Sequence, residues 1–410
     1  MVPYPVQNSD SEIEDWLRSL EADPELGPLL AGPPETREAA GYGHTLIEIC
    51  RQPLLWPDTV RRVCGSKARL APHLKPAKWI GITGSGSSEY AGACAHLALQ
   101  PEMGVPVVSV AGGWLLLEGL RGIPPARPGV LVSLARSGDS PESAAVVQMY
   151  LKITPQVHHI VITCNPAGRL ATHFRDSAAV VLLDERTNDR SLVMTSSFTN
   201  LAVAARSLGR LENPEVAERT AEQQSEAARY VLSSRVPAIA AVARAPFGKA
   251  VFLGSGSSFG AARESALKML EMNAGRIPTM AETYLGLRHG PMCLMDEATL
   301  VVAFLSSDPL VRSYEQDLLT ELRRKQLGAR MLVVGENVPA DLPGPADTVI
   351  EVPGLSALGD DDAAVVDVVV GQLLAFFRCL AGGLRPDSPS EGVISRVVNE
   401  FAVHWRNGEE

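Results

Sequence analysis

The segment KWIGITGSGSSEYAGA, residues 78–93, returns later in the chain as KAVFLGSGSSFGAA, residues 249–262. The two GSGSS motifs begin at Gly84 and Gly254, which are 170 positions apart. The same offset recurs downstream, because VLVSLARSGDSPES at 130–143 aligns with LVVAFLSSDPLVRS at 300–313. Self-similarity over several successive segments indicates a duplicated topology. The sequence therefore predicts two repeats of one unit.

Each repeat alternates apolar runs with amphipathic stretches. Runs that are continuously apolar are typical of strands covered on both faces, as in parallel sheets. Each repeat is therefore predicted to be a doubly wound α/β unit with a parallel sheet. The expected strands are 79–83, 105–110, 130–134, 160–163 and 180–183 in the first repeat, and 250–253, 300–305, 331–334 and 349–352 in the second.

The repeats do not account for the whole chain. We expect a helical N-terminal extension at 1–72, with helical patterns at 11–20 and 36–50, packed on the first repeat. The first repeat is expected at 73–225, the second at 226–385 and a polar tail at 386–410, to which no pattern assigns a role. These boundaries define the predicted domains.

Composition narrows the class of protein. Of 410 residues, 46% are hydrophobic and 20% are charged, which is typical of a soluble globular protein. The net charge of −10 would repel nucleic acid and anionic lipid, so neither is expected as a partner. No signal peptide is predicted. The six cysteines form no CxxC pair, so we expect no metal, no disulfide framework and a cytoplasmic location.

The two GSGSS loops each follow a strand and open a helix. Backbone N–H groups and serine hydroxyls converge there, and the helix dipole favours an anion, so the loops fit a phosphate; simple helix capping is the alternative. The loop at 133–140 also closes a strand and precedes Pro141, a favoured first residue of a helix. Because neighbouring strands end at one crevice, the expected phosphate site comprises Ser87, Ser88, Arg136, Ser137 and Ser140. Weaker expected sugar contacts are Ser85, Thr195, Ser196 and Ser257.

Two other motifs offer alternative interpretations of the GSGSS loops. Glu89 and Phe259 stand where a dinucleotide-binding GxGxxG motif needs its third glycine, so a nicotinamide enzyme is disfavoured. Residues 256–260, GSSFG, match the GxSxG motif of serine hydrolases, which leaves a hydrolase with Ser258 as nucleophile as an alternative. The loop of the first repeat lacks the final glycine, which favours a fold-based origin of the motif.

A charged helix face follows the second GSGSS loop. At 100° per residue, Glu264, Lys268 and Glu271 share one side of a helix. They could form a catalytic set or ordinary ion pairs on a solvated face. Further on, Glu282 and His289 fall in a segment bounded by Gly and Pro, where a single histidine is more often structural than catalytic.

These motifs together resemble the sugar isomerase (SIS) family. Residues 75–385 are similar to the isomerase half of glucosamine-6-phosphate synthase. They are closer to the branch named for tagatose-6-phosphate ketose/aldose isomerase and galactosamine-6-phosphate deaminase. The matching segments are RSGDSPES at 136–143, TNDRSLVMTSSF at 187–198 and RHGP at 288–291. The resemblance implies two tandem SIS domains, each a flavodoxin-like three-layer sandwich.

The resemblance also implies roles for the site residues. The serines of the first repeat would hold a sugar phosphate, and Glu271 would be the enolising base, with Lys268 and Glu264 on its helix face. His289 would open the sugar ring in a neighbouring subunit's site, which implies a homodimer or larger homo-oligomer.

Some positions depart from the synthase. The last lysine of the chain is Lys325, and the tail offers Arg396 where the synthase has an imine-forming lysine. Ala135 and Arg136 replace a serine and a glutamine of its phosphate loop. No cysteine follows Met1, so a glutamine-hydrolysing domain is not expected.

The implied substrate is a hexose or hexosamine phosphate. The implied reaction moves a proton between C1 and C2 through an enediol or enolamine, which needs no cofactor. Deamination of galactosamine 6-phosphate to tagatose 6-phosphate is expected, with simple isomerisation still open. A sugar-phosphate sensor without catalysis is the alternative of another class.

Overall fold

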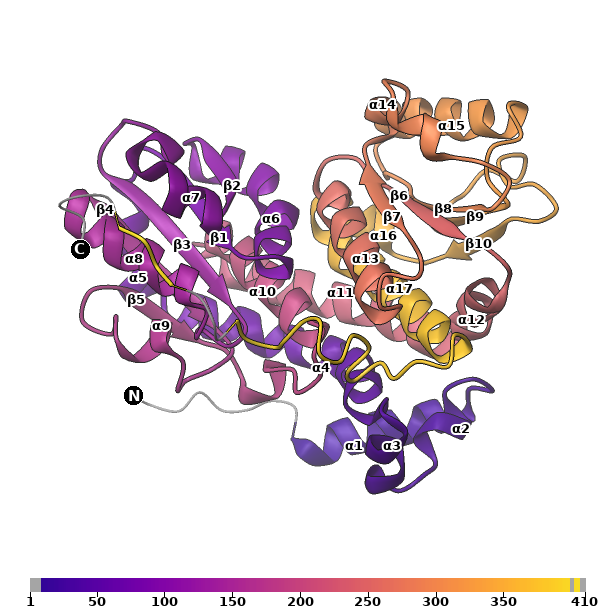
Figure 1. The fold of residues 1–410 in the computed structure, drawn as a ribbon. Helices are drawn as coiled ribbons and strands as arrows, with labels where there is room; N and C mark the ends of the chain where they lie inside the picture. The colour runs from indigo at the N-terminus through magenta and orange to yellow at the C-terminus, as the bar shows by residue number, and fades with distance from the viewer. Residues whose placement is uncertain (1–8, 399–401, 406–410) are drawn as a thin grey trace.

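The computed structural model describes residues 9–398 and 402–405 and contains two parallel five-stranded sheets (Figure 1). In the first repeat the strand order is β2-β1-β3-β4-β5, and every pairing is parallel. The strands are β1 Ile80–Gly84, β2 Val107–Ala111, β3 Gly129–Ala135, β4 Val157–Thr163 and β5 Ala179–Leu182. All five expected strands of this repeat are thereby confirmed.

The second sheet repeats this topology. Its order, β7-β6-β8-β9-β10, is that of the first sheet with each strand replaced by its counterpart. The strands are β6 Lys249–Leu253, β7 Thr279–Glu282, β8 Thr299–Phe304, β9 Arg330–Gly335 and β10 Thr348–Glu351. The sequence missed β7, because this edge strand has four half-buried residues and no apolar run. Glu282 therefore ends a strand, whereas the sequence placed it in a loop.

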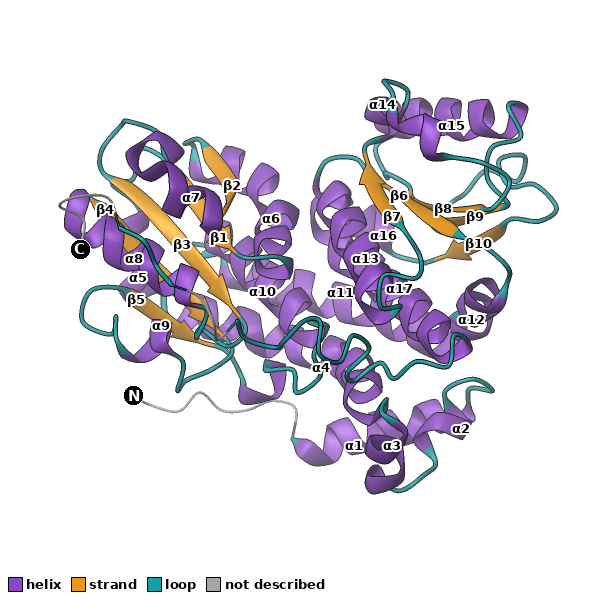
Figure 2. Ribbon diagram, in the orientation of Figure 1, coloured by secondary structure: helices purple, strands orange, loops and turns teal. Residues whose placement is uncertain are grey.

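Helices cover both faces of each sheet, which gives two three-layer units (Figure 2). The first repeat contains α6 Ser87–Met103, α7 Gly112–Glu118, η2 Gly119–Gly122, α8 Pro141–Ile153, α9 Arg169–Thr172, η3 Glu185–Thr187, α10 Ser196–Ser207, η4 Leu208–Arg210 and α11 Pro214–Ser234. The second contains α12 Val236–Arg244, α13 Ser257–Met272, α14 Tyr284–Leu287, η5 Pro291–Leu294, α15 Pro309–Arg324, α16 Leu355–Leu358 and α17 Asp360–Ala381. Among the described residues, α17 alone is long and apolar enough to cross a membrane, but 89% of its apolar window is buried inside the protein.

The two repeats meet where α6 packs against α13. A Cβ added to Gly260 would lie only 2.7 Å from the backbone nitrogen of Cys94, so the two helices cross too closely for a side chain at this position. The Arg263 guanidinium also donates two hydrogen bonds to the Glu89 carboxylate, at 3.1 and 3.0 Å. Because residue numbers rise along one helix as they fall along the other, the helices are antiparallel. This crossing brings the C-terminal half of α13 to the N-terminus of α6.

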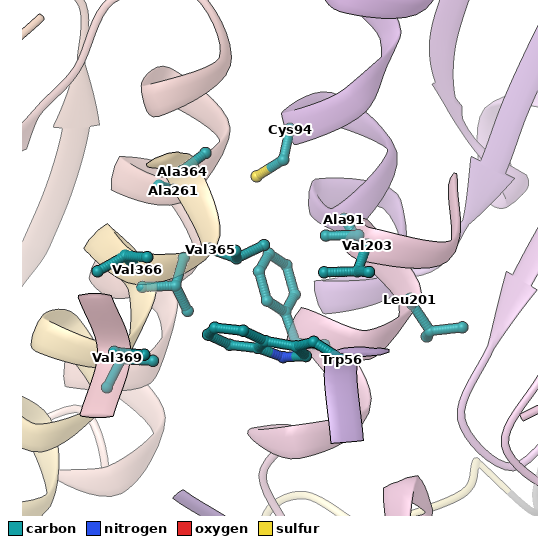
Figure 3. Close-up of a cluster of buried hydrophobic side chains, with 14 of the residues drawn as sticks. Trp56, Ala91, Cys94, Leu201, Val203, Ala261, Ala364, Val365, Val366 and Val369 are labelled. Atoms are coloured by element: carbon teal, nitrogen blue, oxygen red, sulfur yellow. The ribbon is translucent and has the colours of Figure 1, made fainter. Parts of the chain in front are cut away.

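The N-terminal extension contains α1 Asp10–Ser19, η1 Leu20–Ala22, α2 Gly27–Leu30, α3 Pro34–Ala40, α4 Gly43–Gly65 and α5 Lys67–Leu74. Trp56 of α4 is fully buried among side chains from both repeats (Figure 3). Gln52 accepts a hydrogen bond from Thr199 of α10 at 2.7 Å and donates one to Gln372 of α17 at 2.8 Å. The extension thus contacts both repeats, whereas the sequence predicted contact with the first.

The tail after α17 runs back across the molecule to the first repeat (Figure 1). The Asp387 carboxylate accepts hydrogen bonds from the backbone N–H and the hydroxyl of Thr45, both at 2.7 Å. The Asp387 carbonyl accepts another from Leu192 N at 2.9 Å. The tail therefore links the start of α4 to the 187–198 segment.

Candidate active site

The charged face of α13 lies against the GSGSS loop of the first repeat. The Lys268 ammonium donates a hydrogen bond to the Glu271 carboxylate and another to the Ser87 hydroxyl at 3.2 Å. Its nitrogen also lies 3.3 Å from a Glu264 oxygen. The side chains of Lys268 and Glu264 are fully buried, which excludes the alternative of ion pairs on a solvated face. Of the three side chains, only that of Glu271 is partly exposed, at 24%.

Burial sets the charges of this cluster. It raises the pKa of Glu264 to about 8, with the nearby Glu271 adding to the rise and the Lys268 ammonium opposing it. Burial also disfavours the Lys268 ammonium, but the two carboxylates outweigh that cost and raise its pKa above the usual value. Near neutral pH, Glu264 therefore carries a proton while Lys268 remains charged. Glu271 is the carboxylate of this cluster that a ligand can reach.

The two expected phosphate loops of the first repeat lie side by side, because β1 and β3 are adjacent parallel strands. Ser87 and Ser88 are buried at the start of α6, and the Ser88 hydroxyl lies 3.9 Å from the sulfur of Met194. The Ser137 hydroxyl accepts from the Asp139 backbone N–H at 3.3 Å, and the Ser140 hydroxyl donates to Glu142 at 3.0 Å. The structure thus brings both loops and the acid–base face of α13 to one end of the first sheet.

Arg136 lies in the second of these loops, but its guanidinium faces carbonyl groups. It donates to the carbonyl oxygens of Ser191, Leu192 and Arg396 at 3.2, 2.9 and 2.9 Å. The side chain is almost fully buried. These contacts tie the loop to the 187–198 segment and to the tail.

The weaker candidates are divided between the repeats. Ser85 belongs to the first GSGSS loop, and its hydroxyl lies 3.5 Å from where a Cβ on Gly112 would be. Thr195 and Ser196 are buried at the start of α10, close to Ser88 through Met194. Ser257 belongs to the second repeat, where its hydroxyl donates to Asp361 at 2.6 Å, so it does not join the other candidates.

Sequence reasoning missed Glu48, a buried carboxylate on α4. It accepts hydrogen bonds from the backbone N–H groups of Arg190 and Ser191 and from the Ser191 hydroxyl. Burial, with help from the nearby Asp189, raises its pKa to about 7. A lone glutamate within the apolar pattern TLIEIC was the available signal. Glu48 fixes the segment that carries the TND motif.

The tail supplies another group that the sequence could not place. Arg396 donates to the Asp189 carbonyl at 3.0 Å and to the Asn188 side-chain oxygen at 2.7 Å. Further back, the Ser390 hydroxyl donates to the Glu271 carbonyl at 3.3 Å. The tail therefore spans the distance from the proposed base to the 187–198 segment and borders the site.

His289 does not join the cluster within one chain. It is exposed just after α14, on the second repeat, and its backbone N–H donates to the Gly286 carbonyl at 2.9 Å. Within residues 9–398 and 402–405, its side chain makes no hydrogen bond or ion pair with Glu264, Lys268 or Glu271. The expected role in a neighbouring subunit remains a prediction.

The serine-hydrolase alternative loses its support. The Ser258 hydroxyl is buried and donates to the Asp367 carboxyl at 3.0 Å, and no histidine of the described chain contacts it. The last glycine of the GxSxG match, Gly260, is explained by the close approach of α13 to α6. The motif therefore reflects helix packing.

A cavity of about 830 Å³ lies elsewhere, between α5 and the edge strand β5. Arg69, His73 and Arg175 contribute to its lining. None of the predicted site residues does, so it is separate from the cluster around Lys268.

Comparisons with known proteins agree with the fold, although no family model matches the chain. A Streptomyces coelicolor protein, named provisionally as D-galactosamine-6-phosphate deaminase AgaS, is 38% identical over 373 residues, covering 89% of this chain and 96% of that protein. The D-galactosamine-6-phosphate deaminase AgaS of Escherichia coli is 33% identical, covering 90% and 98%. The crystal structure of tagatose-6-phosphate ketose/aldose isomerase from Escherichia coli is similar with a TM-score of 0.78 at 33% identity, covering 86% and 95%. With the duplicated fold and the joined loops, these similarities show that the chain belongs to the sugar isomerase (SIS) family, in the branch of the AgaS deaminases and tagatose-6-phosphate isomerases.

Proposed function

We propose that this enzyme converts D-galactosamine 6-phosphate into tagatose 6-phosphate and ammonia. One observation carries the proposal: the buried Lys268 contacts both Glu271 and Ser87, which joins a general base on one repeat to a phosphate loop on the other. The choice of sugar rests on the names of the relatives, and the proposed acid–base reaction rests on the contacts of Lys268.

The residues suggest a sequence of proton transfers. Ser87, Ser88, Ser137 and Ser140 hold the phosphate, and the Glu271 carboxylate takes the C2 proton of the open-chain sugar. The C2–H electron pair forms the C1–C2 double bond of an enolamine, while the C1 carbonyl oxygen accepts a proton from water. Return of the proton from Glu271 to C1 gives a C2 iminium ion, which loses one proton to the hydroxide left by that water. A second water hydrolyses the resulting imine to the ketone and ammonia. Lys268 holds the Glu271 carboxylate in place by a hydrogen bond, and Arg136 positions the loop through its carbonyl contacts.

A sensor that only binds phosphosugars would need the serine loops but not the cluster on α13. Burying a lysine between two carboxyl groups is costly, and such sets are concentrated at functional sites. This cluster therefore favours an enzyme. A simple isomerase would use the same C2 proton, so only the products separate it from a deaminase.

The test of the proposed function is ammonia release from galactosamine 6-phosphate, coupled to glutamate dehydrogenase. Galactose 6-phosphate serves as the matched substrate without an amino group, with ketose formation as the readout. Ketose from galactose 6-phosphate without ammonia from the amino sugar would leave only an isomerase. If neither sugar exchanged its C2 hydrogen in heavy water, the protein would be a phosphosugar sensor without catalytic activity.

Ser137→Ala should weaken binding of the phosphosugar by about 1.5–3 kcal/mol, because it removes one hydroxyl from a charge-assisted set. Binding of the same sugar without phosphate should change little. Calorimetry with both ligands checks this. An equal loss for both would mean that the loop only caps α8.

The second prediction concerns assembly and rests on the exposure of His289. If His289 completes a neighbour's site, mixing inactive Glu271→Gln subunits with inactive His289→Ala subunits should restore part of the activity, because mixed oligomers contain one intact site. Activity is measured after verified subunit exchange. Mixtures that stay inactive would place every catalytic group within one chain. A homo-oligomer and a cytoplasmic location are part of the proposal.

A further inference from the structure

The second repeat has the same kind of serine loops as the first, but its own carboxylates fill them. The hydroxyl of Ser306 and both the backbone N–H and the hydroxyl of Ser307 donate to the Asp360 carboxylate, the last two at 2.6 and 2.7 Å. These donors follow β8, where the second loop of the repeat begins. One carboxylate thus accepts three hydrogen bonds from a single loop.

The other serines of the second repeat are also occupied. The hydroxyls of Ser255 and Ser257 donate to Glu315 and Asp361, each at 2.6 Å. Glu315 additionally accepts from the Ser306 backbone N–H at 2.8 Å. Charge-assisted hydrogen bonds of this type are short and strong. Both loops of the second repeat are therefore engaged by carboxyl groups of the same chain.

The corresponding position in the first repeat is different. Ser307 aligns with Ser137 at the 170-residue offset, and no carboxylate of the described chain contacts the Ser137 hydroxyl. The helix that carries Asp360 explains the difference. In the first repeat, α10 begins at Ser196, and the 170-residue offset aligns this position with Val366. In the second repeat, α17 begins at Asp360, which is six residues earlier than that aligned position. These six additional helical residues, about one and a half turns, bring the aspartate to the loop.

Simple helix capping does not account for Asp360. Acidic residues in a first turn are stabilised by the helix dipole, and a capping carboxylate accepts from N–H groups of its own helix. The donors to Asp360 instead belong to Ser306 and Ser307, which lie more than 50 residues earlier and outside the helix. The carboxylate is therefore bound by a loop of the phosphate-binding type.

We propose that Asp360 occupies the anion position of the second repeat as a built-in ligand, and that removing its carboxylate opens there a site for a tetrahedral anion of the phosphate class. In the intact protein the Ser137 hydroxyl of the first repeat has no carboxylate partner among the described residues, although Ser140 of the same loop donates to Glu142. In the second repeat the corresponding Ser307 is bound to Asp360, and Ser257 at the start of α13 is bound to Asp361.

The test uses Asp360→Ala in the full chain and counts bound inorganic phosphate by calorimetry. We expect the variant to bind one equivalent per chain more than the unmodified protein, and Ser307→Ala in the same background to abolish that increment. Asp317→Ala is the matched control, because it removes an exposed carboxylate from α15, also in the second repeat, without touching the loop. It should leave the stoichiometry unchanged.

Three results would overturn the proposal. They are a folded Asp360→Ala variant without the increment, an increment that survives Ser307→Ala, or the same increment in Asp317→Ala. If Asp360→Ala is recovered unfolded, refolding in phosphate is compared with refolding in chloride of equal ionic strength. Recovery of Asp360→Ala in phosphate, with no recovery once Ser307→Ala is added, supports the site, whereas recovery of both variants or of neither refutes it. Because the count is relative to the unmodified protein, the outcome is independent of whether the first repeat binds a phosphosugar.

Discussion

Glu271→Gln is expected to lower kcat for ammonia release by about 10²–10⁴-fold, because a carboxamide cannot accept the C2 proton. Phosphosugar affinity should remain nearly intact, because the phosphate loops lie on the first repeat. The coupled ammonia assay measures kcat, and calorimetry measures affinity. A kcat within threefold of the unmodified enzyme would exclude Glu271 as the base.

Glu264→Gln is the matched control on the same helix face. Because burial raises the pKa of Glu264 to about 8, this residue is already protonated at neutral pH, and a neutral amide resembles it in charge. The loss of activity at pH 7 should therefore be much smaller than for Glu271→Gln. Above pH 8 the native carboxyl ionises and the variant cannot, so their pH profiles should diverge there. The opposite order of losses at pH 7 would exchange the roles of the two carboxyl groups.

Lys268→Met is expected to lower the free energy of unfolding by about 3–5 kcal/mol, because it removes the buried ammonium and leaves both of its carboxyl partners, Glu264 and Glu271, without it. Unlike Glu271→Gln, it should also weaken phosphosugar binding, because the ammonium donates to Ser87. The kcat for ammonia release should fall at least as far as in Glu271→Gln. Urea unfolding at pH 7 and calorimetry check the two effects.

The double variant Lys268→Met/Glu271→Gln shows how much of the stability lost in Lys268→Met comes from the unpaired charge and how much from altered packing. Removing both members of a buried ion pair is often close to neutral, so the double variant should regain part of the stability lost in Lys268→Met, while staying inactive. Lys268→Met with unchanged stability would show that the ammonium does not hold α13 against α6.

Local patterns explain which parts of the fold were predictable. Continuous apolar runs revealed nine of the ten strands in the described part of the chain. The central strands are buried on both faces, which requires them to be apolar throughout. The edge strand β7 has the sequence TMAE, which carries no such run. The 170-residue offset predicted the matching topologies because both copies use the same loop residues at the same strand ends.

The site was predictable to the extent that it depends on helix geometry. The 100° rotation per residue placed Glu264, Lys268 and Glu271 on one face, but the burial of Glu264 and Lys268 depends on tertiary packing, including the contact of Lys268 with Ser87 of α6. Contacts between distant parts of the sequence could not be predicted. Arg396 donates to the Asp189 carbonyl over a separation of 207 positions, and no local pattern indicates that contact. Glu48 similarly acts through a segment distant in the sequence.

The antiparallel crossing of α6 and α13 also constrains how such a chain can evolve. The serine loops are encoded in the first half of the gene and the acid–base residues in the second, so neither half carries a complete set of active-site residues. A recombination event that exchanged one half for that of a distant homologue would have to preserve the close approach of Gly260 to Cys94. The two halves must therefore change in sequence together at this crossing for the site to be kept.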